Sequence, residues 1–180
     1  MCGRYELKLG DDRKGRQIRE RCEKLDLLFS EGEIFPSSNV LCVVPAGSKI
    51  DLRTMRWGIG GKRLQINARI ESLKDHISYE SMKHKRCAVI CNGFYEWDDR
   101  RRKYYISFAQ KYMYLACIFN ESDELLIMTR EADEGFKRIH GRMPIILDQP
   151  QMLAYIHDDP MTIDEKQLFI KELDDQTTLF

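Results

Sequence analysis

The cysteine at position 2 carries the most reactive chemistry that this sequence offers. Removal of Met1, which is common ahead of a small second residue, would give Cys2 a free α-amine beside its thiol. The ordinary pKa is about 8 for an α-amine and about 8.5 for a cysteine thiol, so a fraction of each group is nucleophilic near neutral pH. A 1,2-aminothiol attacks aldehydes: the amine forms a Schiff base, and the thiol then closes a thiazolidine ring. The alternative is an ordinary cysteine near a frayed end. The apparent strand that begins at Gly3-Arg4-Tyr5 favours the reactive interpretation, because it holds the terminus in place.

Two further motifs carry polar groups that could serve this chemistry. Asn67-Ala68-Arg69 follows a glycine-rich turn. Its amide both donates and accepts hydrogen bonds, and its guanidinium offers a fork to phosphate. Spacing alone is equally typical of a turn asparagine beside a solvated arginine. Glu96 lies in Gly93-Phe94-Tyr95-Glu96-Trp97, at the end of an apolar run. A partly buried carboxylate there could shuttle protons, whereas an edge-strand glutamate would face water.

A histidine motif completes the set of candidate residues. His140-Gly141-Arg142-Met143-Pro144 lies between a predicted helix and a predicted strand, where loops often carry function. An imidazole titrates near neutral pH, so His140 is a candidate acid–base group, and a helix-capping role is the alternative.

Composition limits the kind of protein that positions these residues. The 180 residues suit a single domain over 1–180, and a hydrophobic content of 43% supports one core. Lys plus Arg and Asp plus Glu number 29 each, which excludes a polycationic nucleic-acid binder but allows a local basic groove. No apolar run approaches the ~20 residues of a membrane span, and the first residues lack the apolar core of a signal peptide. We therefore expect a cytoplasmic protein, nucleoid-associated when bound to DNA, with its six cysteines reduced. Cys87 and Cys91 are expected to be buried in a strand and not to form half of a zinc site.

Hydrophobic periodicity predicts an α+β domain with a mixed or antiparallel, barrel-like sheet flanked by short helices. The last part of the chain is expected to hold three successive strands in a meander and two terminal helices. The predicted helices are Asp11–Ser30, Glu131–Ile139, Gln149–His157 and Ile163–Leu173, and the predicted strands are Val40–Val44, Ile50–Trp57, Arg86–Trp97, Lys103–Phe108, Tyr112–Phe119, Glu124–Thr129 and Met143–Leu147.

The four motifs, in this order, resemble the SOS-response-associated peptidase (SRAP) family. Their order is highly specific, and the resemblance spans roughly residues 2 to 147. Supporting matches are Asn39-Val40, Trp57-Gly58 and Thr129. The resemblance implies a compact α+β domain around a barrel-like sheet. It also implies autopeptidase removal of Met1 and a lyase-like, covalent reaction of Cys2 with abasic sites in single-stranded DNA, through a thiazolidine.

The resemblance also implies a role for each matching residue. Asn67 would position the aminothiol, Glu96 would handle protons at the amine, and His140 would assist opening of the sugar ring. The residues matching the family's DNA contacts are Arg4, Asn39, Trp57, Arg69, Thr129 and Arg142. No metal or other cofactor is implied, and a monomer that binds no membrane is expected.

The sequence departs from the family pattern in two places. The segment Gly58–Ile66 is shorter than usual, and the family's closing C-terminal strand is not evident in the sequence.

One alternative function is an N-terminal-nucleophile peptidase or amidohydrolase, in which Cys2 attacks an amide and its own amine is the base. The other is a non-enzymatic nucleic-acid-binding module, in which Cys2 is incidental.

Overall fold

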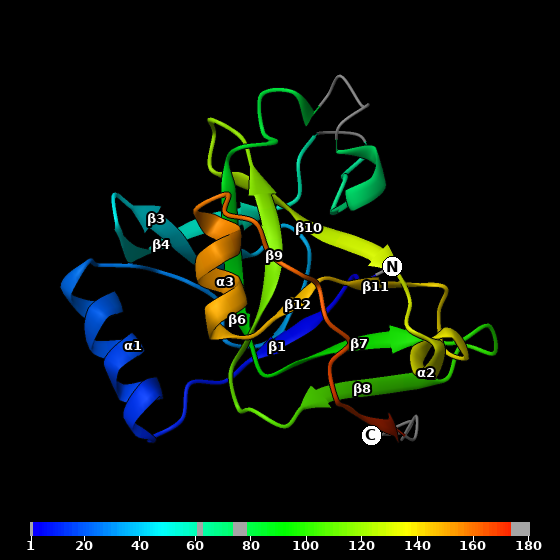
Figure 1. The fold of residues 1–180 in the computed structure, drawn as a ribbon. Helices are drawn as coiled ribbons and strands as arrows, with labels where there is room; N and C mark the ends of the chain where they lie inside the picture. The colour runs from blue at the N-terminus through cyan, green and yellow to red at the C-terminus, as the bar shows by residue number, and fades with distance from the viewer. Residues whose placement is uncertain (1, 61–62, 74–78, 174–180) are drawn as a thin grey trace.

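Two β-sheets dominate the computed structural model, which describes residues 2–60, 63–73 and 79–173 (Figure 1). The smaller sheet has the strand order β13-β8-β7-β1-β2, with antiparallel pairing at every step. Its strands are β1 (Tyr5–Leu7), β2 (Gly32–Ile34), β7 (Gly93–Trp97), β8 (Lys103–Phe108) and β13 (Leu168–Leu173).

The larger sheet closes on itself. Strand β10 pairs antiparallel with β9 and parallel with β4, so that β4, β3, β6, β9 and β10 form a ring. This confirms the predicted α+β class with a barrel-like mixed sheet. The strands of this sheet are β3 (Asn39–Ala46), β4 (Lys49–Trp57), β5 (Asn67–Arg69), β6 (Arg86–Cys91), β9 (Met113–Phe119), β10 (Glu124–Glu131), β11 (Arg142–Pro144) and β12 (Ile146–Leu147).

The helices in the described part of the chain are short and lie outside the ring (Figure 1). Helix α1 (Arg13–Lys24) begins where the Asp12 side chain accepts a hydrogen bond from the Gly15 amide, at 3.0 Å. Helix α3 (Gln149–Ile156) starts with a capping box formed by Asp148 and Gln151. Helix α2 (Glu134–Lys137) and the 3₁₀ helix η1 (Ile70–Ser72) are single turns.

Several predicted elements have other bounds in the structure. The first helix ends at Lys24 instead of Ser30, because Asp26 adopts a positive φ of 51° that stops a right-handed helix. The predicted strand Arg86–Trp97 is two strands, separated at Asn92 and belonging to different sheets. The predicted meander is also divided, since β8 lies in the smaller sheet while β9 and β10 pair in the larger one.

The predicted helix Ile163–Leu173 is wrong. Its second half is strand β13, which pairs along all six of its residues with β8. Leu168 and Ile170 pack partly buried against the core while Phe169 and Lys171 are exposed, which is the period of a strand and not of a helix. The chain therefore does have a C-terminal strand that closes the smaller sheet.

One hydrophobic core lies between the sheets and inside the ring. All six cysteines are free and buried, and Cys87 and Cys91 lie in β6, as predicted. The described residues contain no cluster of side chains with the composition of a metal site. No helix among them is long and apolar enough to cross a membrane.

Candidate active site around Cys2

Cys2 lies directly ahead of β1 and is completely buried. Its backbone carbonyl accepts a hydrogen bond of 3.0 Å from Nδ2 of Asn67, a residue 65 positions away in sequence. Burial raises the pKa of the Cys2 thiol to about 12, and the negative charge of the Glu96 carboxylate contributes to the increase. The structure thus brings three of the predicted residues together and keeps the thiol protonated at neutral pH.

Asn67 is held in place by two neighbouring strands. Strand β5 pairs in parallel with β10, which puts Asn67 opposite Ile127. The residue before it, Ile66, accepts a 2.9 Å hydrogen bond from the indole Nε1 of Trp57. The buried side-chain oxygen of Asn67 has no hydrogen-bond partner among the described residues. The amide therefore uses its donor on Cys2 and keeps an acceptor for another group.

Glu96 is a buried carboxylate on β7, with 5% of its surface exposed, which is one of the two alternatives that the sequence left open. Strand β7 pairs with β1, where the Tyr95 amide donates to the Arg4 carbonyl at 2.9 Å. This pairing places Glu96 beside the segment that carries Cys2. One of its oxygens accepts a hydrogen bond of 3.3 Å from the Trp97 amide. A carboxylate is rarely buried unless it serves a specific interaction, which makes Glu96 a candidate proton acceptor.

Arg142 is fixed by contacts that the sequence did not indicate. Its guanidinium donates to both carboxylate oxygens of Glu71, each at 2.9 Å, and also to the Thr129 carbonyl at 2.8 Å. The hydrogen bonds from Arg142 hold the pKa of Glu71 below its usual range. The Thr129 hydroxyl in turn donates to the carbonyl of Ala68, the residue after Asn67, at 3.3 Å. Arg142 and Thr129 therefore belong to the network that adjoins Asn67.

His140 lies between α2 and β11 and is tied to the same network through Arg142. Its Nδ1 lies 2.9 Å from both the amide nitrogen and the carbonyl oxygen of Arg142. The first contact suits a ring that accepts at Nδ1 and the second a ring that donates there, so the contacts orient the imidazole without fixing its tautomer.

The two other predicted arginines have different surroundings. The Arg4 guanidinium lies between the rings of Phe35 and Trp97, 4.4 and 4.9 Å from their centroids, and pairs with Glu33 at 3.0 Å. Arg69 is exposed on β5, and no ion pair involves it within the described part of the chain. Arg69 is thus the more accessible of the two for phosphate.

Trp57 and Asn39, expected to contact DNA, differ in exposure. Trp57 is completely buried and packs against the ring of Tyr5, with 5.5 Å between the centroids. Its indole anchors Ile66 and so supports the strand that carries Asn67, and its contact with DNA stays a prediction. Asn39 is exposed at the start of β3, opposite Arg56.

Sequence reasoning missed Glu71 as a member of the site. It lies two residues after Arg69, but no feature of the sequence links it to Arg142, which is 71 positions away. Only the pairing of β10 with both β5 and β11 places the two segments side by side.

This fold and this arrangement of a buried second-residue cysteine, an amide and a carboxylate define the chain as an SRAP-type domain. The profile of the family described as "SOS response associated peptidase (SRAP)" matches residues 1–179, and the chain belongs to that family.

Comparisons with individual proteins agree with this assignment. Abasic site processing protein YoaM of Bacillus subtilis is 30% identical over 177 residues, covering 82% of this chain and 75% of that protein. Abasic site processing protein HMCES of Gallus gallus is 29% identical over 141 residues, covering 54% of this chain and 42% of that protein. A crystal structure of a protein from Bacteroides thetaiotaomicron has the same fold, with a TM-score of 0.76, 16% identity, and coverage of 97% of this chain and 93% of the other.

Proposed function

We propose that this chain processes abasic sites in DNA and that, once Met1 is removed, Cys2 bonds covalently to abasic sites in single-stranded DNA. The observation that carries the proposal is the environment of Cys2. Its carbonyl is held by Asn67, and its thiol lies within the electrostatic reach of the buried Glu96. The family to which the chain belongs supports it, since relatives such as YoaM and HMCES are named abasic site processing proteins.

The proposed reaction joins the aminothiol to the aldehyde of the ring-opened abasic sugar. The α-amine of Cys2 adds to the aldehyde carbon and water leaves, which gives a Schiff base. The thiol sulfur then adds to the same carbon while the proton of the thiol passes to the imine nitrogen, which gives the N–H of the thiazolidine. The net change is the loss of one water molecule from protein plus DNA, with no oxidant or reductant.

Removal of Met1 changes the charge beside the thiol. It replaces a neutral amide with an amine that is an ammonium ion when protonated, next to the buried carboxylate of Glu96. A positive charge near a thiol favours its thiolate, and a nearby carboxylate could accept the proton that the ammonium must lose. We propose Glu96 as that proton acceptor and Asn67 as the group that fixes the Cys2 backbone.

The remaining site residues fit the sugar and the phosphates. We propose that the imidazole of His140 assists opening of the deoxyribose ring as an acid–base group. Arg69 and Arg142 would bind flanking phosphates, and Thr129 would hold the Arg142 fork in place. Arg4, already paired with Glu33, would support the stretch that carries Cys2.

The test is to mix the processed protein with single-stranded DNA that contains one abasic site and to run a denaturing gel with mass spectrometry. We expect an adduct that survives denaturant and whose mass is the sum of the partners less one water. Cys2→Ser should form at most a labile imine, because a hydroxyl closes the ring less readily than a thiolate. Cys22→Ser, a change of another buried cysteine on α1, is the matched control and should crosslink normally.

A form that retains residues ahead of Cys2, verified by mass spectrometry, separates the proposal from simple thiol addition. It keeps the thiol but not the free amine, so it should form no stable adduct. A stable crosslink from this form would overturn the thiazolidine and leave thiol addition or a lysine Schiff base as the explanation.

A further inference from the structure

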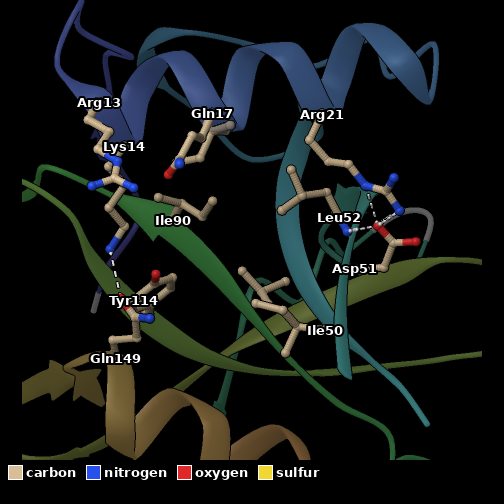
Figure 2. Close-up of a pocket in the computed structure, with 12 residues that line it drawn as sticks. Arg13, Lys14, Gln17, Arg21, Ile50, Asp51, Leu52, Ile90, Tyr114 and Gln149 are labelled. Carbon is tan, nitrogen blue, oxygen red and sulfur yellow. Dashed lines mark hydrogen bonds and ion pairs between the residues drawn. The ribbon is translucent and has the colours of Figure 1, made fainter. Parts of the chain in front are cut away.

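A groove on the outer face of the ring sheet is a feature that the proposed reaction does not use. It lies between helix α1, the edge of β4 and the start of α3, and it encloses about 510 Å³ (Figure 2). We call it the α1–α3 groove. Its lining residues are Arg13, Lys14, Gln17, Ile18, Arg21, Val43, Ile50, Asp51, Leu52, Ile90, Tyr114 and Gln149.

The α1–α3 groove is separate from the Cys2 site. None of the residues that surround Cys2 lines it. Ile90 and Cys91 are neighbours on β6, so their side chains point to opposite faces of the sheet. Ile90 faces the groove, whereas the thiol of Cys91 lies on the interior side and interacts with Cys2. Figure 1 shows α1 on one side of the molecule and the paired ends of β10 and β11 on the other.

The floor of the groove is apolar. Val43, Ile90 and Tyr114 form it from three adjacent strands, and Leu52 and Ile50 extend it along β4. Ile50 is 43% exposed, which is unusual for a large aliphatic side chain beside a cavity. An occupant with a bulky apolar group would cover this surface.

The charge of the groove is uneven. At the far end, beside the last turn of α1, the Arg21 guanidinium donates to the Asp51 carboxylate at 2.8 and 3.0 Å, and this ion pair has no net charge. At the near end, beside the first turn of α1, Lys14 donates to the neutral amide oxygen of Gln149 at 3.4 Å and lies over the rings of Tyr114 and Tyr112, 5.1 and 5.9 Å from their centroids. Neither Lys14 nor Arg13 takes part in an ion pair within the described residues (Figure 2). Both cations lie in the first turn of α1, where the helix dipole adds positive potential. The occupant is therefore expected to be anionic at this end.

The edge of β4 indicates what kind of occupant fits. On one side β4 pairs with β3 along its length, whereas on the other it pairs with β10 only at Arg56 and Trp57. Between Lys49 and Met55, that second edge pairs with no strand in the described part of the chain. A peptide backbone can pair with a strand edge of this kind, although the Leu52 amide already donates to the Asp51 carboxylate at 2.8 Å.

We propose that the α1–α3 groove docks an acidic peptide segment of a partner protein, with one bulky apolar side chain on the floor and carboxylates against Arg13 and Lys14. The volume suits a short segment. Single-stranded nucleic acid fits less well, because it needs a track of cations with exposed aromatic faces, and Tyr114, the one aromatic residue here, is 4% exposed.

A peptide selection tests this proposal directly. A phage-displayed library of random dodecapeptides is selected on the full-length protein, and the enriched peptides are synthesised and their affinities measured by fluorescence anisotropy. We expect enriched sequences to combine Asp or Glu with Leu, Ile or Phe. No enrichment, or enriched peptides without acidic residues, would overturn the proposal.

Variants locate the binding. Arg13→Glu/Lys14→Glu reverses the charge at the near end, and Gln17→Trp fills the groove from α1; each should weaken the selected peptides by roughly tenfold or more. Arg16→Glu/Lys24→Glu makes the same charge change on α1 residues that do not line the groove and should bind as the unchanged protein does. Equal affinity in all variants would place the peptides elsewhere and refute the groove.

Competition distinguishes the other occupants, and DNA crosslinking serves as the independent readout. If oligo-dT or decanoate displaced the selected peptide from the groove, the occupant would be a nucleic acid or a small anionic amphiphile, and the peptide proposal would fail. The groove variants should still crosslink abasic DNA, because none of the changed residues belongs to the Cys2 site. Peptide binding therefore tests the groove proposal, and DNA crosslinking tests the proposed function, independently of each other.

Discussion

At the scale of the residue, the surroundings of Cys2 disfavour the thiolate form of its side chain. Burial and the nearby Glu96 carboxylate raise the pKa of its thiol to about 12, well above its ordinary value. Because the folded pKa is the higher one, stability falls as pH rises above about 8.5, where the unfolded thiol ionises and the folded one does not. The reactive form is therefore expected to depend on the change of charge that exposure of the α-amine brings.

Alkylation rates should reveal this state. In the chain that retains Met1, iodoacetamide should modify Cys2 roughly a thousandfold more slowly at about pH 8 than in the unfolded chain, since reaction needs the thiolate. The rate should rise with pH toward 12. Peptide mapping by mass spectrometry separates Cys2 from the other five cysteines, and an unhindered rate at neutral pH would contradict the burial.

The pairing of Arg142 with Glu71 gives a second test at this scale. Glu71 accepts hydrogen bonds from both terminal nitrogens of the Arg142 guanidinium, which are the donors that a phosphate would use. The Glu71 side chain is 53% exposed. Glu71→Gln should therefore tighten binding of single-stranded DNA by about threefold, because it removes a competing, largely solvated charge. Arg142→Ala should weaken binding. Anisotropy titrations check both, and weaker binding by Glu71→Gln would mean instead that Glu71 positions the arginine.

At the scale of the element, the site depends on how β5 is held. The three-residue strand β5 carries Asn67, and its approach is fixed by the hydrogen bond from Trp57 to Ile66 and by parallel pairing with β10. Strand β4, which supplies Trp57, thus supports the site from the core.

Trp57→Phe should show this support. It removes the donor to the Ile66 carbonyl and some packing against Tyr5, so the free energy of unfolding should fall by about 2–3 kcal/mol. Denaturant unfolding measures the loss, and the crosslinking rate should fall as well, because Asn67 loses its anchor. Leu64→Ala, a partly buried residue of the same loop that makes no such hydrogen bond, is the control and should crosslink nearly as well as the unchanged protein.

At the scale of the whole molecule, the chain has 29 basic and 29 acidic residues, and basic side chains near the site form ion pairs with acidic neighbours. Arg4 and Lys103 share Glu33, and Arg142 is bound by Glu71. Arg69 is exposed without an ion pair in the described residues, so DNA binding is expected to rely on few phosphate contacts. Salt dependence should therefore be shallow.

Arg69→Ala tests this expectation. Loss of one phosphate contact should reduce the slope of log affinity against log salt by about 0.7 for single-stranded DNA and weaken binding at low salt. Affinity measured over a series of salt concentrations gives the slope. An unchanged slope would show that Arg69 does not contact phosphate.

The sequence alone predicted most of the local elements and the kinds of reactive side chain. Ile50–Trp57 and Gln149–His157 were predicted within a residue or so, because strand alternation and a capping box are set by neighbouring residues. The motifs around Cys2, Asn67, Glu96 and His140 likewise indicated the family and the reaction class. Strand β13 was mistaken for a helix, because its identity depends on pairing with β8, some 60 positions earlier.

Only the tertiary structure decided how these residues act together. Closure of the ring through β10 brings Asn67 to Cys2 and Glu71 to Arg142, and it buries Trp57 in the core. The raised pKa of Cys2 and the uneven charge of the α1–α3 groove are equally results of contacts between distant segments. Local periodicity cannot encode such contacts, because burial and pairing depend on which strands meet when the chain closes, whereas residue type and order fix only the chemistry available there.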